Sequence, residues 1–257
     1  TGYYGYTPST TLPDFFGSEN DIVGFGYNNQ DWLLTGNGEN LNDNYVTGTI
    51  NTTVGEIFGM NKFVYLKAKA LLQGAYASGG LMNDNLRSGS GGNLIPLTDP
   101  YRSAPYNTAF IHVNNPVPEA ADIPVFANQS NANDNIVDWV FVEVRNAVTS
   151  GSYILQTRSA LIQRDGDIVD TDGKSLLYFK DLTDHIYTVT IRHRNHLAMS
   201  TNNAGNQYAR MSNLSYLSEF DFTTATANRL LGNGGNANTS NYNITGGLNM
   251  LFGGNAN

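Results

Sequence analysis

The sequence predicts an all-β protein whose main body is an antiparallel β-sandwich, and two observations support this fold class. Apolar residues recur at or near every second position along 136–145 and 185–193, which is typical of half-buried strands. Between these segments lie two D-G pairs, at 165–166 and 172–173, the dipeptide most typical of tight hairpin turns. The stretch before residue 136 contains several prolines, which disfavour helix. We therefore expect only one helical turn, near residues 83–87.

Along the chain, the expected strands fall into two regions, with extended arms at both termini. Residues 1–125 form a β-rich region with a long loop, in which the alternation along 63–70 places two lysines on an exposed face. A polar linker at 128–135 precedes the predicted sandwich, which covers residues 130–225. The Asn/Gly-rich end, residues 226–257, is expected to be an extended C-terminal arm.

Composition restricts the classes of partner. Only 14% of the 257 residues are charged and the formal net charge is -8, so the chain repels phosphate backbones and we expect no nucleic-acid binding. No apolar run approaches the roughly 20 residues of a spanning helix, so no membrane insertion is expected. The lack of cysteine excludes disulfides and cysteine zinc sites. Asparagine outnumbers even the 27 glycines. These neutral polar side chains either suit close packing between copies of the chain or simply occupy its many turns.

One group of acidic residues has the spacing of a metal site. Asp165, Asp167, Asp170 and Asp172 fall within eight positions, and such carboxylates could bind calcium. Their spacing departs from the twelve-residue calcium loop, and two successive hairpin turns explain the same residues without a metal. We favour turns, and expect no cofactor other than calcium at this group.

No pattern typical of catalysis is present, and we expect no enzyme activity. Asp138 and Glu143 could form a glycosidase pair only as any two carboxylates could, since nothing in their context singles them out. His193 and His196 lie three apart on a predicted strand, and such positions face opposite sides. They are therefore expected to be surface histidines beside a turn and not zinc ligands.

The stretch from Asn61 to Ser200 contains long phrases that occur together in a known order: KFVYLKAKALLQGAYASGGLMNDNLR, LIPLTDPY, NDNIVDWVFVEVRNA, TRSALIQRDGDIVDTDGKS and YTVTIRHRNHLA. These phrases resemble a module common in large secreted and surface proteins of Bacteroidota. The resemblance implies export by the type IX route and an association with adhesins and hemagglutinin-like proteins. It implies a cell-surface or extracellular location and no enzyme activity.

A looser resemblance concerns the segment from Trp139 to Leu197. A D-G turn, an aromatic strand and a Y-T-V strand make it similar to Ig-like sandwiches of the transthyretin-like and collagen-adhesin B-type kinds. The residues that carry this similarity are Asp172, Gly173, Phe179, Leu182 and Tyr187.

Two non-enzymatic functions stay open. The chain is either a structural subunit that polymerises into a cell-surface filament or layer through strand contacts between subunits, or an adhesin module that binds a glycan or host protein through loops 75–105. Self-assembly of the pure chain would distinguish the first from the second. The side chains expected at the assembly or ligand contacts are Tyr3, Tyr4, Tyr6, Tyr76, Tyr101 and Tyr106.

Overall fold

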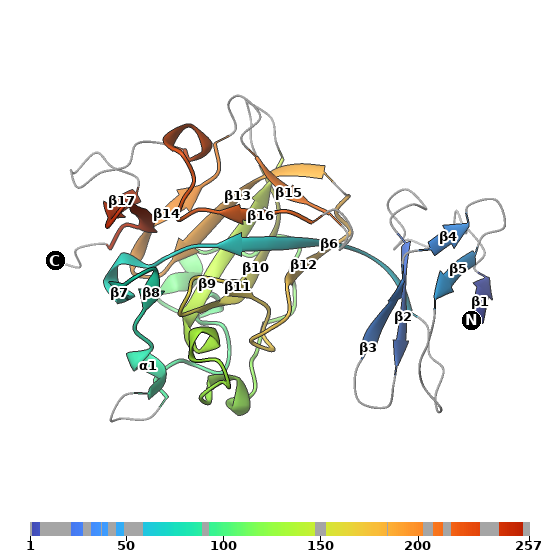
Figure 1. Cartoon of the computed structure of the whole chain (residues 1–257), viewed down its shortest axis with the longest axis horizontal. Coiled ribbons are helices and arrows are strands. Elements are labelled where there is room, and N and C mark those ends of the chain that lie inside the picture. The colour runs from blue at the N-terminus through green and yellow to red at the C-terminus, as the bar shows by residue number, and fades with distance from the viewer. Residues whose placement is uncertain are drawn as a thin grey trace. The chain divides into compact units, whose positions relative to one another are not determined.

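Strands that pair mostly antiparallel are the main regular element of the described residues, which confirms the all-β class (Figure 1). Two compact units are present: unit 1 combines Thr1–Tyr65, Tyr178–His185 and Ser212–Tyr216, and the remaining residues form unit 2. The computed structural model describes residues 2–5, 22–27, 32–36, 38–40, 45–48, 59–88, 93–146, 153–183, 185–202, 208–212, 217–231 and 242–253, with side chains from Val64 onward.

Unit 1 contains two sheets built from short strands. In the first, β5 pairs with β1 and with β4, and in the second, β2 pairs with β3 and with the first part of β6, all antiparallel. β12 lies on the other side of β6. The strands are β1 (Gly2–Gly5), β2 (Ile22–Tyr27), β3 (Trp32–Gly36), β4 (Gly38–Asn40), β5 (Tyr45–Gly48), β6 (Gly59–Lys69) and β12 (Leu177–Lys180).

Unit 2 is organised around a six-stranded sheet. Its strands follow the order β11, β10, β9, β13 and β14, with β15 also paired to β13. Both neighbours of β9 run antiparallel to it, so Val142 lies between Arg158 of β10 and Ile191 of β13. The strands are β9 (Ile136–Arg145), β10 (Ile154–Gln163), β11 (Ile168–Val169), β13 (His185–His193), β14 (His196–Ser200) and β15 (Ala209–Met211).

β9 is buried on both of its faces and not half-buried as the sequence pattern predicted, since every residue from Ile136 to Val144 is buried. The cause is a covering of turns, residues 83–88 and 93–135, which we call the loop layer. It packs its aromatic side chains on one face of the sheet, and Tyr101 Oη donates to the Trp139 carbonyl at 2.8 Å. Its short elements are α1 (Asn85–Ser88), η3 (Pro100–Arg102), η4 (Tyr106–Thr108), η5 (Ile123–Phe126) and η6 (Ala132–Asp134).

The loop layer accounts for a difference from the expected domain organisation. The sequence analysis placed a boundary between residues 125 and 130, whereas the compact units divide after Tyr65, within β6. The linker at 128–135 belongs to unit 2, where Asn135 Oδ1 accepts from the Gln129 amide at 2.8 Å. The expected α-helical turn is confirmed as α1, but the proline-containing stretch also forms short 3-10 helices such as η3, because proline is compatible with the first position of a helical turn.

The second half of β6 pairs in parallel with β16, and its alternation confirms the sequence prediction. Val64, Leu66, Ala68 and Ala70 are buried, whereas Lys67 is exposed. The remaining elements of unit 2 are η2 (Gln73–Ala75), β7 (Tyr76–Ser78), β8 (Leu81–Met82), β16 (Glu219–Asp221), η7 (Ala227–Arg229), β17 (Tyr242–Thr245) and β18 (Leu248–Leu251).

The C-terminal segment ends in a packed hairpin where the sequence analysis expected an extended arm. β17 and β18 pair along four residues each. Tyr242, Met250 and Leu251 are buried, and the Leu251 amide donates to the Leu71 carbonyl at 2.8 Å. The apolar residues within this polar end therefore suffice to fold it onto unit 2.

The turn after β10 brings Gly166 against the end of β6. Its φ is +94°, and an added Cβ would lie 2.4 Å from the Ala70 carbonyl oxygen. We expect Gly166→Ala to lower the free energy of unfolding by about 3 kcal/mol, because backbone strain adds to this clash. Gly79→Ala is the matched control: its φ is +60° but nothing lies within 4 Å, so about 1 kcal/mol is expected. Equal losses in urea unfolding would contradict the role of the close approach.

Candidate functional site

A buried group of charged side chains fastens the loop layer to the sheet. Two of its members come from β10 and the residue that follows β11, and four come from the loop layer, so the group exists only in the folded chain. We call it the buried ionic cluster, and its members are Asp99, Arg102, His112, Glu119, Arg158 and Asp170.

Glu119 is the link between the loop layer and β10. Its Oε1 accepts hydrogen bonds from Arg158 Nε at 3.0 Å and from the Ser159 amide at 3.2 Å. Asn115 Nδ2 donates to the same oxygen at 2.6 Å. The other oxygen, Oε2, has a single long contact, 3.4 Å from Arg102 Nη2. One carboxylate oxygen is thus saturated, and the other is weakly engaged.

Asp99 caps the turn η3, because its Oδ1 accepts from the Tyr101 amide at 3.0 Å. Arg102 Nε donates to Oδ2 at 3.2 Å. Burial by itself would raise the pKa of the Asp99 carboxyl, but His112, the Tyr101 amide and Arg102 outweigh it, so this pKa lies below its usual value. Asp99 is therefore held as a carboxylate inside the protein.

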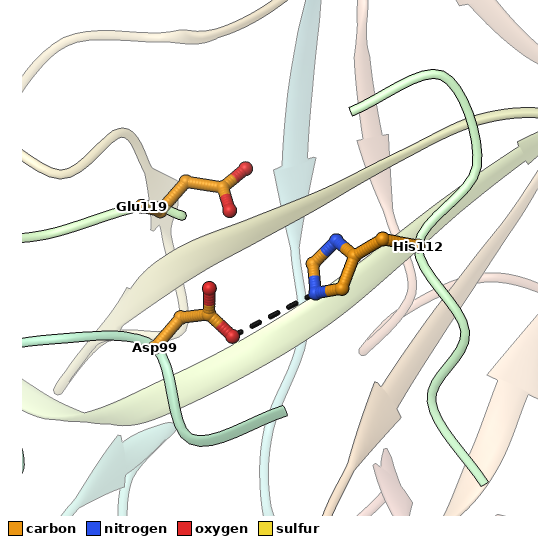
Figure 2. Close-up of side chains that lie close together, drawn as sticks. All are labelled: Asp99, His112 and Glu119. Atoms are coloured by element: carbon orange, nitrogen blue, oxygen red, sulfur yellow. Dashed lines mark ion pairs between the residues drawn. The ribbon is translucent and has the colours of Figure 1, made fainter. Parts of the chain in front are cut away.

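His112 points its imidazole at these two carboxylates (Figure 2). The side chain is only 8% exposed, and Nε2 is buried without a hydrogen-bond partner. The nearest charged atom is Asp99 Oδ1 at 3.7 Å, which is beyond hydrogen-bond distance. At the other ring nitrogen, Nδ1, Asn115 Nδ2 lies at 3.3 Å and Thr157 Oγ1 at 3.5 Å. One buried histidine nitrogen thus faces two carboxylate groups beyond hydrogen-bond distance.

With His112 neutral, the charges of the cluster do not balance. Arg158 Nη2 donates to Asp170 Oδ1 at 2.9 Å, so the two guanidinium groups of the cluster face three carboxyl groups. Burial raises the pKa of Asp170, and Arg158 only partly opposes this effect. The cluster can therefore do two things: fasten the loop layer electrostatically and attract a cation. Among the described residues, the groups close enough to share one ion are Asp99, His112 and Glu119.

A second candidate site is a pocket of about 430 Å³ in unit 2. It combines an apolar floor with three asparagine side chains and the two histidines of the β13–β14 turn. Its lining residues are Leu72, Gly74, Ala75, Asn83, Asn85, Leu86, Val137, Asp138, His193, Asn195, His196 and Gly253.

Hydrogen bonds connect the two histidines of this pocket. The Gly74 amide donates to His196 Nε2 at 3.0 Å, and the two Nδ1 atoms of His196 and His193 lie 2.8 Å apart. His193 Nε2 faces Asp138 Oδ2 at 3.1 Å. Because Nε2 of His196 accepts, its Nδ1 carries the proton, and His193 then donates to Asp138. Burial, followed by the neighbouring His193, lowers the pKa of His196 to about 4.

These positions differ from the surface histidines that the sequence predicted. β13 ends at His193 and β14 begins at His196, so the turn between them brings both rings together. The expected turn is present, but His193 is buried. Residues three apart on one strand face opposite sides, but this rule does not apply here because His193 and His196 belong to two different strands.

The carboxylates weighed as a glycosidase pair do not approach each other through their side chains. Asp138 and Glu143 are five apart on one strand and thus face opposite sides of it. Arg194 Nη2 lies 2.7 Å from Asp138, and Arg192 Nη1 lies 2.7 Å from Glu143. Each carboxylate is neutralised separately.

The aspartates proposed for calcium also pair separately. Asp167 Oδ1 lies 3.1 Å from Lys69 Nζ, and Asp165 Oδ2 lies 3.9 Å from the same nitrogen. Burial and the neighbouring Asp167 raise the pKa of Asp165. The ammonium group of Lys69 therefore lies where a cation shared by these two carboxylates would have to bind.

The other two aspartates face different partners. Asp170 turns to Arg158, and Asp172 Oδ1 accepts from the Ser175 amide at 2.8 Å. Gly173 has a φ of +76°, which a tight turn requires. The structure thus supports the turn interpretation of both D-G pairs, and the four aspartates form no common cage.

The predicted contact tyrosines are distributed differently from expectation. Tyr101 is fully buried, because its ring packs on Phe141 and its hydroxyl is bonded to the Trp139 carbonyl. Tyr106 and Tyr76 are half-buried. The N-terminal tyrosines, whose side chains lie outside the described part of the chain, are Tyr3, Tyr4 and Tyr6.

Sequence reasoning did not find the buried ionic cluster. A weak signal was present, since isolated charges in an otherwise apolar segment such as LIPLTDPYR require buried partners. In the described ranges there is no helix of a length and hydropathy suited to crossing a bilayer. Compared with family models, curated proteins and solved structures, the chain matches none of them, so functional inference depends on the geometry above.

Proposed function

We propose that the chain is a non-enzymatic structural module of the cell surface that assembles with further copies of itself. One observation supports this function best: six of the eleven large hydrophobic side chains that are exposed in the described residues belong to the loop layer. We call these six the aliphatic surface, and they are Leu86, Leu94, Leu97, Ile111, Val117 and Ile123.

Solvent exposure of such side chains is costly, and apolar surface patches typically mark contact sites. We infer that these six side chains act together in one contact. Ile123 is 72% exposed and Val117 is 69% exposed, although the same layer buries Tyr101, Phe110 and Phe126. A chain in which only 14% of residues are charged also places few charges that would oppose contact between copies. These properties fit an interface that becomes buried on assembly.

The buried ionic cluster keeps the aliphatic surface in one conformation. Arg102 Nη2 donates to the Val117 carbonyl at 2.8 Å, and the Ala121 amide donates to the Leu97 carbonyl at 2.8 Å. Glu119, between these two contacts, is fastened to β10. A surface that is already ordered loses little conformational entropy on association, which favours binding.

We place the contact on the aliphatic surface because the chain covers the edge of its own central sheet. At β14, the Leu197 amide donates to the Phe252 carbonyl at 2.8 Å. The Leu231 amide donates to the Ser200 carbonyl at 2.9 Å. Addition of a strand from another copy at this edge would have to displace both segments.

The test is the concentration dependence of assembly, followed by sedimentation velocity and negative-stain electron microscopy. Ile123→Asp should weaken self-association at least tenfold, about 1.4 kcal/mol, because a carboxylate would lie in an apolar contact. Ile244→Asp is the matched control, since Ile244 is exposed outside the loop layer. Assembly that is unaffected by Ile123→Asp, or a wild-type chain that stays monomeric at every concentration, would contradict the proposal.

The pocket of about 430 Å³ favours a second candidate, an adhesin module for a glycan or a host protein. Its size is that of a small-molecule site, and Asn83, Asn85 and Asn195 offer amide donors and acceptors to a polar ligand. A chain that remains monomeric and binds one glycan saturably would support this candidate instead. Substitution of Asn195 by leucine should then abolish that binding.

A further inference from the structure

We propose that Asp99, His112 and Glu119 form a site for one divalent transition-metal ion of the zinc class. The proposal is independent of self-assembly, because it depends only on the interior of unit 2. It differs from the calcium site considered at the aspartates of the β10–β11 turn, which the structure does not bring together.

The ligand atoms are spaced as a small ion requires. Zinc bonds of about 2.0–2.2 Å in a tetrahedral arrangement hold neighbouring ligand atoms about 3.4 Å apart. His112 Nε2 lies 3.7 Å from Asp99 Oδ1, and one ligand atom from each of the three residues lies within 4.8 Å of the others. The first distance is too long for a hydrogen bond but close to that of two ligands on one ion.

The buried nitrogen is the observation that points to a ligand. His112 Nε2 has no hydrogen-bond partner, its side chain is more than nine-tenths buried, and the ring is directed at both carboxylates (Figure 2). A buried polar atom without a partner costs free energy, and an ion at this position would remove that cost. Thr157 Oγ1, 3.5 Å from Nδ1, is placed to accept a hydrogen bond from the Nδ1–H group when Nε2 binds the ion.

The arginines of the cluster orient the two carboxylates. Arg102 Nε donates to Asp99 Oδ2, and Arg158 Nε donates to Glu119 Oε1. Glu119 Oε2 keeps only the 3.4 Å contact with Arg102 Nη2, and Asp99 Oδ1, which accepts from the Tyr101 amide, keeps a second lone pair for an ion. Hydrogen bonds of this kind orient the ligands of metal sites. With His112 neutral, as a metal ligand must be, three carboxyl groups face two guanidiniums, and the excess negative charge attracts a cation.

The donor set selects the class of ion. One imidazole nitrogen with two carboxylate oxygens suits zinc and similar ions, with a water molecule as the fourth ligand. Calcium prefers six to eight oxygen ligands and magnesium prefers oxygen ligands in an octahedron, so neither fits a three-residue site that includes a nitrogen. The ion would join three points of the loop layer, Asp99, His112 and Glu119.

The experiment titrates the full chain, stripped with EDTA and then dialysed, with zinc chloride by calorimetry and follows thermal unfolding. We expect one ion per chain and a rise in Tm of roughly 5–10 °C when zinc is at 100 times its Kd. Cobalt, used as a visible probe, should give the absorption of a site with nitrogen and oxygen ligands. The ring nitrogen signals of His112 in NMR should shift on zinc addition, which tests the site without any substitution.

Variants locate the ion. His112→Gln removes the nitrogen ligand and should weaken zinc binding at least 100-fold, whereas His196→Gln, at the other histidine group, should leave it unchanged. Absence of saturable zinc binding by the wild-type chain would overturn the proposal. So would full affinity in His112→Gln, unshifted His112 signals, or a loss of binding found only in His196→Gln.

Discussion

Substitution of Glu119 by glutamine is expected to lower the free energy of unfolding by about 1.5–3 kcal/mol. The glutamine keeps the shape of the side chain but removes its charge, so Arg158, which is only 11% exposed, loses one of its two carboxylate partners and keeps Asp170. The charge-assisted hydrogen bond from Arg158 becomes a weaker one to a neutral group, and buried Arg158 cannot recover the difference from water. Urea unfolding in the presence of EDTA measures the effect without any contribution from a bound metal.

A matched control comes from an ion pair at the surface. Glu219→Gln removes the partner of Lys67, and these side chains are 34% and 48% exposed. Water and salt screen such a pair, so a loss of less than about 1 kcal/mol is expected. If both substitutions cost the same, the buried ionic cluster would not fasten the loop layer. Hydrogen exchange of the Ser159 amide, a donor to Glu119, should increase only in Glu119→Gln.

Lowering the pH from 7 to 4 is expected to destabilise unit 2 by about 3 kcal/mol through His196 alone. The pKa of His196 is about 4 in the folded chain, because burial and His193 disfavour its charged form, and its ordinary value is 6.5. Between these two values the unfolded chain binds more protons than the folded chain. Stability is therefore complete above pH 6.5 and is lost as the pH falls towards 4.

The structural reason lies in the hydrogen bonds of this ring. Protonated Nε2 can no longer accept from the Gly74 amide, and a second positive charge arises beside His193 and near Arg194. Asp138, which faces His193, opposes the shift but does not reverse it. Carboxyl groups with a lowered pKa, such as Asp99, lose their stabilising effect only below about pH 4 and thus outside this range.

Two histidine variants separate the contribution of His196 to the pH dependence of stability from that of other groups. His196→Gln should be less stable than wild type at pH 7, but its free energy of unfolding should fall by about 3 kcal/mol less between pH 7 and pH 4. His185→Gln, at an exposed position, should follow the wild-type dependence. Urea unfolding at intervals of half a pH unit gives both slopes. Parallel curves for wild type and His196→Gln would show that another group controls acid stability.

Local features of the fold could be predicted from the sequence wherever neighbouring residues decide them. The alternation along β6 depends only on a period of two, and Gly166 and Gly173 form their turns because the preceding aspartates and the glycine backbone favour them. α1 is a single turn because the helical segment is short and has loop residues on both sides. Each of these predictions is confirmed.

Features that depend on distant segments could not be predicted in the same way. The alternation in β9 correctly predicts a strand, but it does not indicate that the loop layer covers the second face of this strand. For the same reason Tyr101 appeared available for contacts, although it is buried on that face. His193 and His196 meet because a strand ends between them, which a count of positions does not reveal.

By itself, the sequence determined that this chain is an all-β protein, with its main strands, its tight turns and its low charge, because these follow from side-chain period, backbone preference and composition. Only the tertiary structure decided which charges meet. Asp99, His112 and Glu119 come from irregular segments without periodicity, and Arg158 comes from a strand 39 positions beyond Glu119. The free energy of a buried charge depends on what surrounds it in space, and that arrangement exists only after folding.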